Sequence, residues 1–155
     1  MGGPALINDE YYDEFDNFFI CSFIEDDVNY KSTEHYYQSK KFLDQKIKNI
    51  IYNAKTAYDS WSLGNMYPLR KGWDEIKVKV MLDANKLKFD QNEELKKKLI
   101  ESEGEIKFPF SDNFWGSGDI NMLGKILMII RAYYKKDSKI FIELKKNFNF
   151  DIDWN

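Results

Sequence analysis

The sequence predicts an α+β fold, a mostly α-helical single domain with a few short strands. The clearest sign is a helical pattern over residues 73–89, where apolar side chains recur three or four positions apart with charged residues between them. Aromatic and branched residues flank the acidic run 25–27, which indicates two short strands around a turn. A length of 155 residues is typical of one domain, and no proline- or glycine-rich linker divides the chain.

Capping residues and breaks predict the helices before residue 64. Ser32 or the following threonine is placed to cap a helix over 34–43, and a second helical piece covers 46–52. A helix over 54–63 is expected to stop at Gly64, because glycine tolerates the left-handed conformation past a helix end.

Elements of the second half follow the same logic. Asn92 and Asn121 are expected to cap the next two helices, and residues 105–110 are typical of a short strand ended by Pro109. The helices expected here cover residues 93–101, 122–134 and 138–146.

We assign the whole chain, residues 1–155, to one domain. Its core is expected at about 15–135, and a C-terminal helix with an aromatic tail follows at 138–155. The tail ends near Trp154 and is expected to dock either on the core of its own chain or on a partner. Docking on a partner would make the protein a purely structural interaction domain.

Composition excludes several classes of protein. Hydrophobic residues at 43% and charged residues at 32% are typical of a globular chain, and no segment reaches the roughly 20 apolar residues that span a bilayer. With 23 basic and 26 acidic residues, the net charge of −3 argues against binding duplex nucleic acid along a broad basic face. One cysteine cannot form an internal disulfide and the start lacks a signal-peptide pattern, so a cytoplasmic location is expected.

Motifs for metals, cofactors and activated nucleophiles are missing. One histidine and one cysteine leave no zinc-type spacing, and neither a P-loop nor a dinucleotide-binding glycine motif is present. No serine sits in a nucleophile elbow. A catalytic pair of Cys21 with His35 stays open, although a lone cysteine is more often a small buried apolar residue. We therefore expect no metal and no cofactor, and look for chemistry among carboxylates, lysines and aromatic residues.

Glu34 is the most informative carboxylate. It is expected in the first turn of its helix, where unpaired amides and the positive end of the helix dipole favour the ionised form, and so a base or a stabiliser of positive charge. Tyr37, Gln38 and Lys41 follow at helical spacing, so one face presents a carboxylate, a phenol, an amide and an amine. More commonly, a glutamate in a first turn only offsets the dipole.

Two further patterns suggest ligand contacts. Asp112 and Trp115 lie in a loop with Gly116, which would let the backbone approach a ligand, although the pair could equally cap and bury the loop. Arg70 and Arg131 are the only arginines among 23 basic residues, and their forked side chains suit bidentate contacts to phosphate or carboxylate. A buried structural ion pair would explain either arginine equally well.

Six blocks between Phe15 and Arg131 occur in an order that resembles the NADAR, or YbiA-like, family, whose members include N-glycosidases acting on riboflavin biosynthesis intermediates. The strongest block, residues 32–42, matches S-x-E-H-Y-x-Q-x-x-K-F. The others are F-S-N-F at 15–18 with Asp16 replacing the serine, P-L-R-x-x-W at 68–73, K-F at 88–89, D-x-x-W-G at 112–116 and N-x-L-G-x-x-L-M-x-x-R at 121–131. The resemblance implies a single domain of the YbiA-like fold.

It also implies hydrolysis of the N-glycosidic bond between a base or aminopyrimidine and ribose phosphate or ADP-ribose. Positive charge builds up on the sugar as this bond breaks, so Glu34 is the implied central carboxylate and Asp112 the second. Trp73 and Trp115, with Tyr37, are expected to sandwich a flat base. Candidates for binding the phosphate are Arg70, Lys71 and Arg131. The expected binding set is completed by Lys88, Gly116 and Asn121.

Alternatives remain within this resemblance. Lys107 stands where the family often carries a glutamate, and the loop before Asn121 is short, so the pocket could bind ADP-ribose or a nucleotide without hydrolysing it. Desolvated Lys41 or Lys88 could instead form a Schiff base with the opened sugar. The expected partner is a small nucleotide-like or ribose-phosphate substrate. No association with a membrane is expected. Ribosylated pyrimidine phosphates compete with ADP-ribosylated guanine, including a flipped or single-stranded base in nucleic acid.

Overall fold

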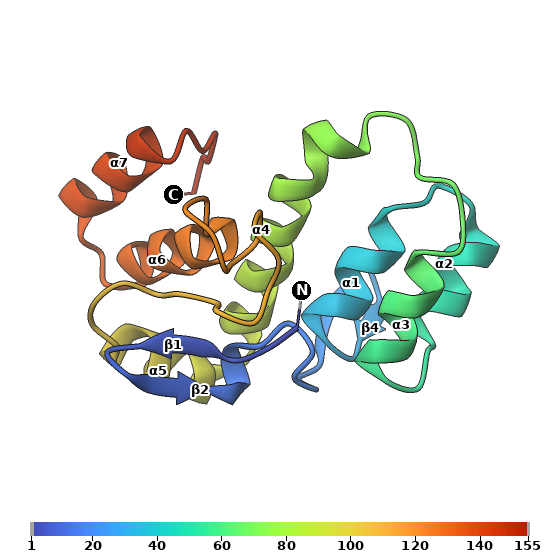
Figure 1. Cartoon of the computed structure of the whole chain (residues 1–155), viewed down its shortest axis with the longest axis horizontal. Helices are drawn as coiled ribbons and strands as arrows, with labels where there is room; N and C mark the ends of the chain where they lie inside the picture. Colours follow the sequence, from blue (N-terminus) through green and yellow to red (C-terminus); the bar gives the residue numbers. More distant parts are fainter. Residues whose placement is uncertain (1, 155) are drawn as a thin grey trace.

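The computed structural model describes residues 2–154, which form two short β-hairpins and seven α-helices (Figure 1). The strands are β1 (Ala5–Ile7), β2 (Glu10–Tyr12), β3 (Phe23–Glu25) and β4 (Val28–Tyr30), and a 3-10 helix covers Asp13–Phe15. The helices are α1 (Thr33–Lys40), α2 (Gln45–Tyr52), α3 (Ala57–Gly64), α4 (Trp73–Gln91), α5 (Glu93–Glu101), α6 (Met122–Tyr134) and α7 (Ser138–Asn147). The predicted α+β class, mostly helical with a few short strands, is confirmed.

Helix α4 is the central element. It contacts α1, α5 and α6, with α1 to α3 on one side and α6 followed by α7 on the other (Figure 1). Trp73, Met81, Leu82, Ala84 and Phe89 on α4 are buried. Helix α1 differs, because all seven residues from Thr33 to Ser39 are buried, most of them polar. Its polar side chains must therefore find partners inside the protein.

Both hairpins turn through two residues with positive φ. Asn8 and Asp9 (47° and 65°) join β1 to β2, and Asp26 and Asp27 (51° and 65°) join β3 to β4. Asparagine and aspartate tolerate this conformation, which tight hairpin turns require. The β3–β4 hairpin is the predicted pair of strands. The β1–β2 hairpin was not predicted, although its strands are as long as β3 and β4.

The prediction of a strand at 105–110 is wrong. Only Lys107 pairs, in a single antiparallel bridge to Leu6 whose two backbone hydrogen bonds measure 2.8 and 3.0 Å. Ile106 and Phe108 on either side of it are buried. The apolar alternation of this run therefore reflects side-chain burial in an extended segment, and no ladder of strand pairs forms.

Side-chain caps set where α1 and α3 begin. Ser32 Oγ accepts a hydrogen bond from the amide of His35 at 3.2 Å, which confirms its predicted role. Helix α3 begins at Ala57 instead of residue 54, because Thr56 Oγ1 accepts from the amide of Asp59 at 3.0 Å.

Three other helix ends work differently from the prediction. Gly64 is the last residue of α3 and is not among the residues with positive φ, so a left-handed conformation does not explain it. Asn92 and Asn121 occupy N-cap positions, but neither side chain caps its helix. The side-chain amide of Asn92 donates instead to the Lys88 carbonyl at 2.7 Å, one turn back in α4. That of Asn121 donates to the Ile106 carbonyl at 2.8 Å and so joins the start of α6 to the extended segment around residue 107.

The C-terminal segment packs on its own chain. The Trp154 ring lies 5.0 Å from that of Tyr133 and 6.0 Å from that of Phe141, between centroids. Phe150 and Ile152 are buried. Of the two expectations for the tail, docking on its own core is what the structure shows. Among the helices of residues 2–154, none is long and apolar enough to cross a membrane.

Candidate active site

Five of the predicted site residues line a single cleft of about 360 Å³. The cleft lies between α1, the C-terminal half of α3, the start of α4 and the turn that begins at residue 112. The five predicted residues in it are Tyr37, Lys41, Trp73, Asp112 and Trp115. Side chains that were not predicted as site residues also line it, among them Gln38, Trp61, Asp74 and Lys77.

Glu34 lies behind the cleft wall. Its side chain is completely buried, and its amide donates to the carbonyl of Asn17 at 3.0 Å. Carboxylate Oε1 accepts a 2.6 Å hydrogen bond from Nε2 of Gln38, the next residue on the same face of α1. Oε2 has no hydrogen-bond partner among the described residues. Because Gln38 lines the cleft and Glu34 does not, Gln38 separates the carboxylate from the cleft.

Burial decides the protonation state of Glu34. It raises the pKa of this carboxyl to about 7 from an ordinary 4.5, while the Gln38 hydrogen bond and the positive charge of Lys41 oppose the rise. This corrects the expectation of a firmly ionised carboxylate. The helix-start argument leaves out desolvation, and the Glu34 amide is already paired. Near neutral pH the group exists in both forms, which suits it to exchange a proton.

Aromatic packing fills the space where a sandwiched base was expected. The Tyr37 ring lies edge-on to Trp73 at 5.2 Å and to Trp115 at 5.7 Å, between centroids. All three side chains are almost fully buried. Burial and the nearby Glu34 charge raise the pKa of the Tyr37 hydroxyl, so it stays protonated. The three rings form one wall of the cleft and leave no space between them for a flat ligand.

Asp112 builds the turn that carries Trp115. Its Oδ1 accepts hydrogen bonds from the amides of Phe114 at 3.1 Å and Trp115 at 2.8 Å, while the residue stays exposed at the cleft. A Cβ added to Gly116 would lie 2.1 Å from the Phe108 carbonyl oxygen. The glycine is therefore needed for contact with the protein's own backbone, which corrects the expectation that it approaches a ligand.

The two lysines proposed for covalent chemistry occupy different surroundings. Lys41 lines the cleft, with its Nζ 5.7 Å from the Tyr37 ring centroid, and burial lowers its pKa against the opposing pull of Glu34. Lys88 does not line the cleft and is completely buried. It donates to the Asp16 carbonyl at 3.0 Å, and burial lowers its pKa to about 8.

Neither arginine lines the cleft. The Arg131 guanidinium donates to Ser102 Oγ at 3.1 Å and to the Gly104 carbonyl at 2.6 Å, which is a structural role away from the site. The Arg70 amide donates to the Lys41 carbonyl at 2.9 Å, and its side-chain Nε is buried with no hydrogen-bond partner in residues 2–154. The side-chain amide of Asn121 is also used within the fold, because its Nδ2 donates to the Ile106 carbonyl.

Lys77 is the cation that sequence reasoning missed. It lines the cleft, with its Nζ 3.3 Å from Asp74 Oδ1 and 4.5 Å from the Phe114 ring centroid. The signal was present, because Lys77 follows Trp73 by four positions on the same helix and so shares its face.

The histidine and cysteine do not form a catalytic pair. The His35 ring bonds through Nδ1 to Ser32 Oγ at 2.7 Å and through Nε2 to the Ala54 carbonyl at 3.0 Å. Both ring nitrogens therefore serve the fold, and none is left for Cys21. In residues 2–154, no group of three or more His, Cys, Asp or Glu side chains is placed to hold a metal ion.

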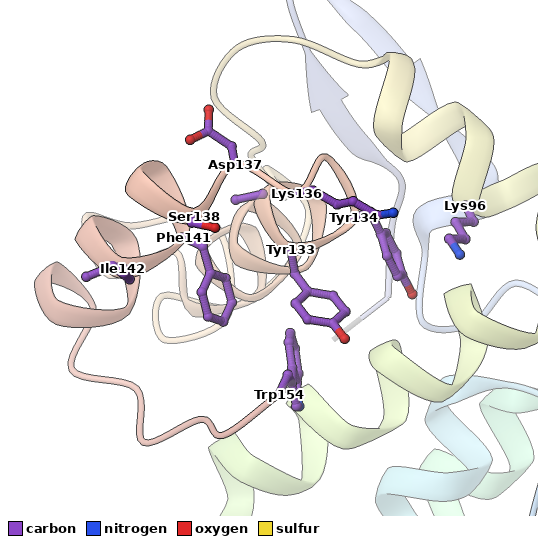
Figure 2. Close-up of a pocket in the computed structure, with 10 residues that line it drawn as sticks. Lys96, Tyr133, Tyr134, Lys136, Asp137, Ser138, Phe141, Ile142 and Trp154 are labelled. Carbon is purple, nitrogen blue, oxygen red and sulfur yellow. The ribbon is translucent and has the colours of Figure 1, made fainter.

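A larger cavity, of about 640 Å³, lies between α6, α7 and the chain end (Figure 2). Its walls include the rings of Tyr133, Tyr134, Phe141 and Trp154. None of the predicted site residues lines it, and its one carboxylate, Asp137, caps α7 by accepting from the Ile140 amide at 3.1 Å. We therefore place the candidate active site in the smaller cleft.

Comparison with known proteins agrees with the fold and shows the family. The NADAR domain family model matches residues 7–134. N-glycosidase YbiA of Escherichia coli K12 is 32% identical over 128 residues, which covers 77% of this chain and 80% of the relative. An N-glycosidase of Nostoc punctiforme is 33% identical over 131 residues, covering 77% and 84%. A riboflavin biosynthesis protein of Vibrio vulnificus is 34% identical over 131 residues, covering 79% of this chain and 36% of the relative.

The solved structures give the same answer. The NMR structure of the E. coli protein YbiA matches with a TM-score of 0.69 at 29% identity, covering 83% of this chain and 81% of that chain. The fold and the site thus define an α+β protein of the YbiA-like class. The chain belongs to the NADAR domain family, as its sequence blocks predicted. The match ends at residue 134, so α7 and the aromatic tail lie beyond it.

Proposed function

We propose that this protein is an N-glycosidase that hydrolyses the bond between a base or aminopyrimidine and ribose phosphate or ADP-ribose. One observation carries the proposal: a buried carboxyl, Glu34, with a pKa of about 7, sits at the wall of an aromatic cleft. Family membership supports it, since two relatives are named N-glycosidases. Riboflavin biosynthesis intermediates are the favoured substrates, because a third relative is named a riboflavin biosynthesis protein.

In this proposal, Glu34 is the general base. Water attacks the anomeric carbon, the carbon–nitrogen bond breaks, and its electron pair leaves with the nucleobase or aminopyrimidine, which takes up a proton from solvent. Glu34 accepts a proton of the attacking water, and the exposed Asp112 carboxylate stabilises positive charge on the sugar. Because Glu34 lies behind the wall, the water must enter beside Gln38 and bond to the free Oε2.

Substrate binding follows from the remaining cleft residues. Lys41 and Lys77 are the cations that line the cleft, so we assign phosphate binding to them in place of the two arginines. Trp61 is 37% exposed at the cleft, whereas the indoles of Trp73 and Trp115 are packed against Tyr37. We therefore assign stacking of the base to Trp61.

A covalent route is a second candidate mechanism. Lys41 lines the cleft and its pKa is lowered by burial, the two properties that a Schiff-base lysine needs. Its amine would add to the opened sugar and release the base, and water would then free the sugar. Lys88 is less suited, because it lies outside the cleft and is bonded to the Asp16 carbonyl.

The test is a substrate panel followed by chromatography of the released base. It consists of a ribosylaminopyrimidine phosphate, ADP-ribosylated guanosine, NAD and ADP-ribose. We expect release of the aminopyrimidine from the first compound. Release from ADP-ribosylated guanosine alone would assign the protein to removal of ADP-ribose from bases. Tight calorimetric binding of ADP-ribose, with no product from any compound, would overturn the proposal in favour of a binding module.

A further inference from the structure

Gln38 is held in a fixed position between two elements. It is 1% exposed and lies on α1 one helical turn after Glu34. On one side, its Nε2 donates to Glu34 Oε1 at 2.6 Å. On the other side, its carboxamide packs against Gly64 at the end of α3, where an added Cβ would lie 2.0 Å from Gln38 Oε1 and 2.8 Å from its Cδ. No side chain larger than glycine fits at residue 64 while Gln38 keeps this position.

The contact explains a glycine that helix geometry does not. Gly64 has no positive φ at the last residue of α3, so the helix end does not require a glycine. The approach of the Gln38 carboxamide does require one. The chain therefore carries a glycine where Gln38 needs the space to reach Glu34.

Two acceptor atoms are left unpaired by this arrangement. Glu34 Oε2 and Gln38 Oε1 are both buried with no hydrogen-bond partner among the described residues. Buried acceptors of this kind are costly unless a donor satisfies them. With Oε1 of Glu34 occupied by Gln38, the carboxylate presents Oε2 alone to a donor that enters from the cleft.

We propose that Gln38 is a positioning residue, which is locked by Gly64, fixes the Glu34 carboxylate through Oε1 and leaves Oε2 as the acceptor for the attacking water. The inference rests on the proposed role of Glu34 as the base. Gln38 itself neither gives nor takes a proton. Its amide N–H stabilises the ionised form of Glu34, so it determines the pH at which the base becomes active.

Other charges near Glu34 set the background for this effect. Lys41 favours the ionised form and Asp16 disfavours it. Tyr37, whose ring lies 5.7 Å from Lys41 Nζ, stays neutral because burial and the nearby Glu34 charge raise its pKa. Removing the Gln38 donor leaves these groups in place, so the change in Glu34 titration reports on Gln38 itself.

The test is the variant Gln38→Met, which keeps the volume and removes the donor. We expect the Glu34 titration midpoint, followed by NMR of 13C-labelled glutamate side chains, to rise by about one pH unit, since a hydrogen bond to a charged group contributes about 1.5 kcal/mol. The acid limb of kcat/KM should move by the same amount, giving about tenfold lower activity at pH 6 with near recovery at pH 9. Gly64→Ala should move both readouts in the same direction.

The control is Gln91→Met. Gln91 makes two hydrogen bonds to the Ile24 backbone far from the cleft, so neither readout should change. Gln38→Glu keeps the shape of the side chain and serves if Gln38→Met is poorly folded, because two adjacent carboxylates share a proton and raise the Glu34 midpoint as well. An unchanged Glu34 titration midpoint in Gln38→Met would overturn the inference. If Gln38→Glu is used instead, an unchanged midpoint in that variant would overturn it. The NMR readout needs no substrate. If the wild-type protein were inactive while Gln38→Met still shifted the Glu34 midpoint, only the proposed function would be refuted.

Discussion

The larger cavity and the smaller cleft are both walled by aromatic rings, yet the charged groups near them are paired differently. Beside the larger cavity, Lys86 pairs with Asp90 at 2.6 Å and lies 4.9 Å from the Tyr133 ring and 5.1 Å from the Trp154 ring. Asp90 also accepts a 2.7 Å hydrogen bond from the Tyr134 hydroxyl. Lys86 and Asp90 therefore neutralise each other within the protein.

The smaller cleft leaves its polar groups incomplete. One oxygen of Glu34 and one of Gln38 lack partners among the described residues, and burial shifts the pKa of both Glu34 and Lys41. Incomplete, desolvated groups are typical of sites that complete their bonding with a ligand. The difference teaches that unsatisfied titratable groups, rather than cavity size or aromatic content, identify the candidate site here.

The largest expected effect is on Glu34. We expect Glu34→Gln to lower kcat/KM by at least about 100-fold, because the amide cannot accept a proton. A matched control is Glu93→Gln, which changes the exposed first-turn glutamate of α5. It should keep wild-type activity. Near-normal turnover by Glu34→Gln would show that the carboxylate is not the base.

A smaller effect is expected at Lys41. We expect Lys41→Met to lower kcat/KM about tenfold, because one charge-assisted contact to the substrate phosphate is lost. Lys96→Met changes a lysine that lines the larger cavity and should be silent. Borohydride added during turnover should leave no sugar on the wild-type protein by mass spectrometry. A sugar trapped on Lys41 would instead establish the covalent route.

The next prediction concerns stability and pH. The folded pKa of Glu34, about 7, lies above its ordinary 4.5, so its contribution to stability is complete below pH 4.5 and is lost as pH rises to 7. The loss is about 3 kcal/mol. Glu34→Gln has no carboxyl group to ionise at this position. From pH 4 to pH 8, the free energy of unfolding of this variant in urea, relative to that of wild type, should therefore increase by about 3 kcal/mol. An equal difference at both pH values would mean that folding does not shift the pKa of Glu34.

The smallest effect on activity is expected in the larger cavity. Trp154→Leu removes ring contacts with Tyr133 and Phe141, so we expect a loss of about 2 kcal/mol and a melting temperature lower by several degrees. Activity should stay within about twofold of wild type, since no site residue lines this cavity. A large loss of kcat/KM in a folded variant would undo the contrast between the two cavities.

Periodicity and capping in the sequence were enough to predict most of the helices. The long run at 73–89 became α4 because its apolar face meets its neighbours, and Ser32 caps α1 as its position indicated. Three-residue strands carry almost no periodic signal, so β3 and β4 were found from the acidic run at their turn, whereas β1 and β2 were missed. Gly64 was assigned to the right helix end for the wrong reason, since contact with a distant side chain cannot be seen in local sequence.

The sequence predicted which residues gather at the site better than it predicted their protonation states. The blocks around Glu34, Asp112 and Trp73 led to one cleft or its wall, whereas Arg131 and Lys88 came from other blocks of the same resemblance and serve the fold. A sequence motif cannot distinguish a role in the site from a structural role, because both roles require specific neighbouring residues. Charge states depend on burial in three dimensions, so the sequence predicted an ionised Glu34 where the structure raises its pKa.

The most direct measurement of the central claim is kcat/KM of the wild-type protein between pH 5 and pH 9. With Glu34 as the base, kcat/KM rises with pH along an acid limb with an apparent pKa of about 7, and the residual activity of Glu34→Gln lacks that limb. A wild-type limb near 4.5, or activity that falls as pH rises through 7, would contradict the account.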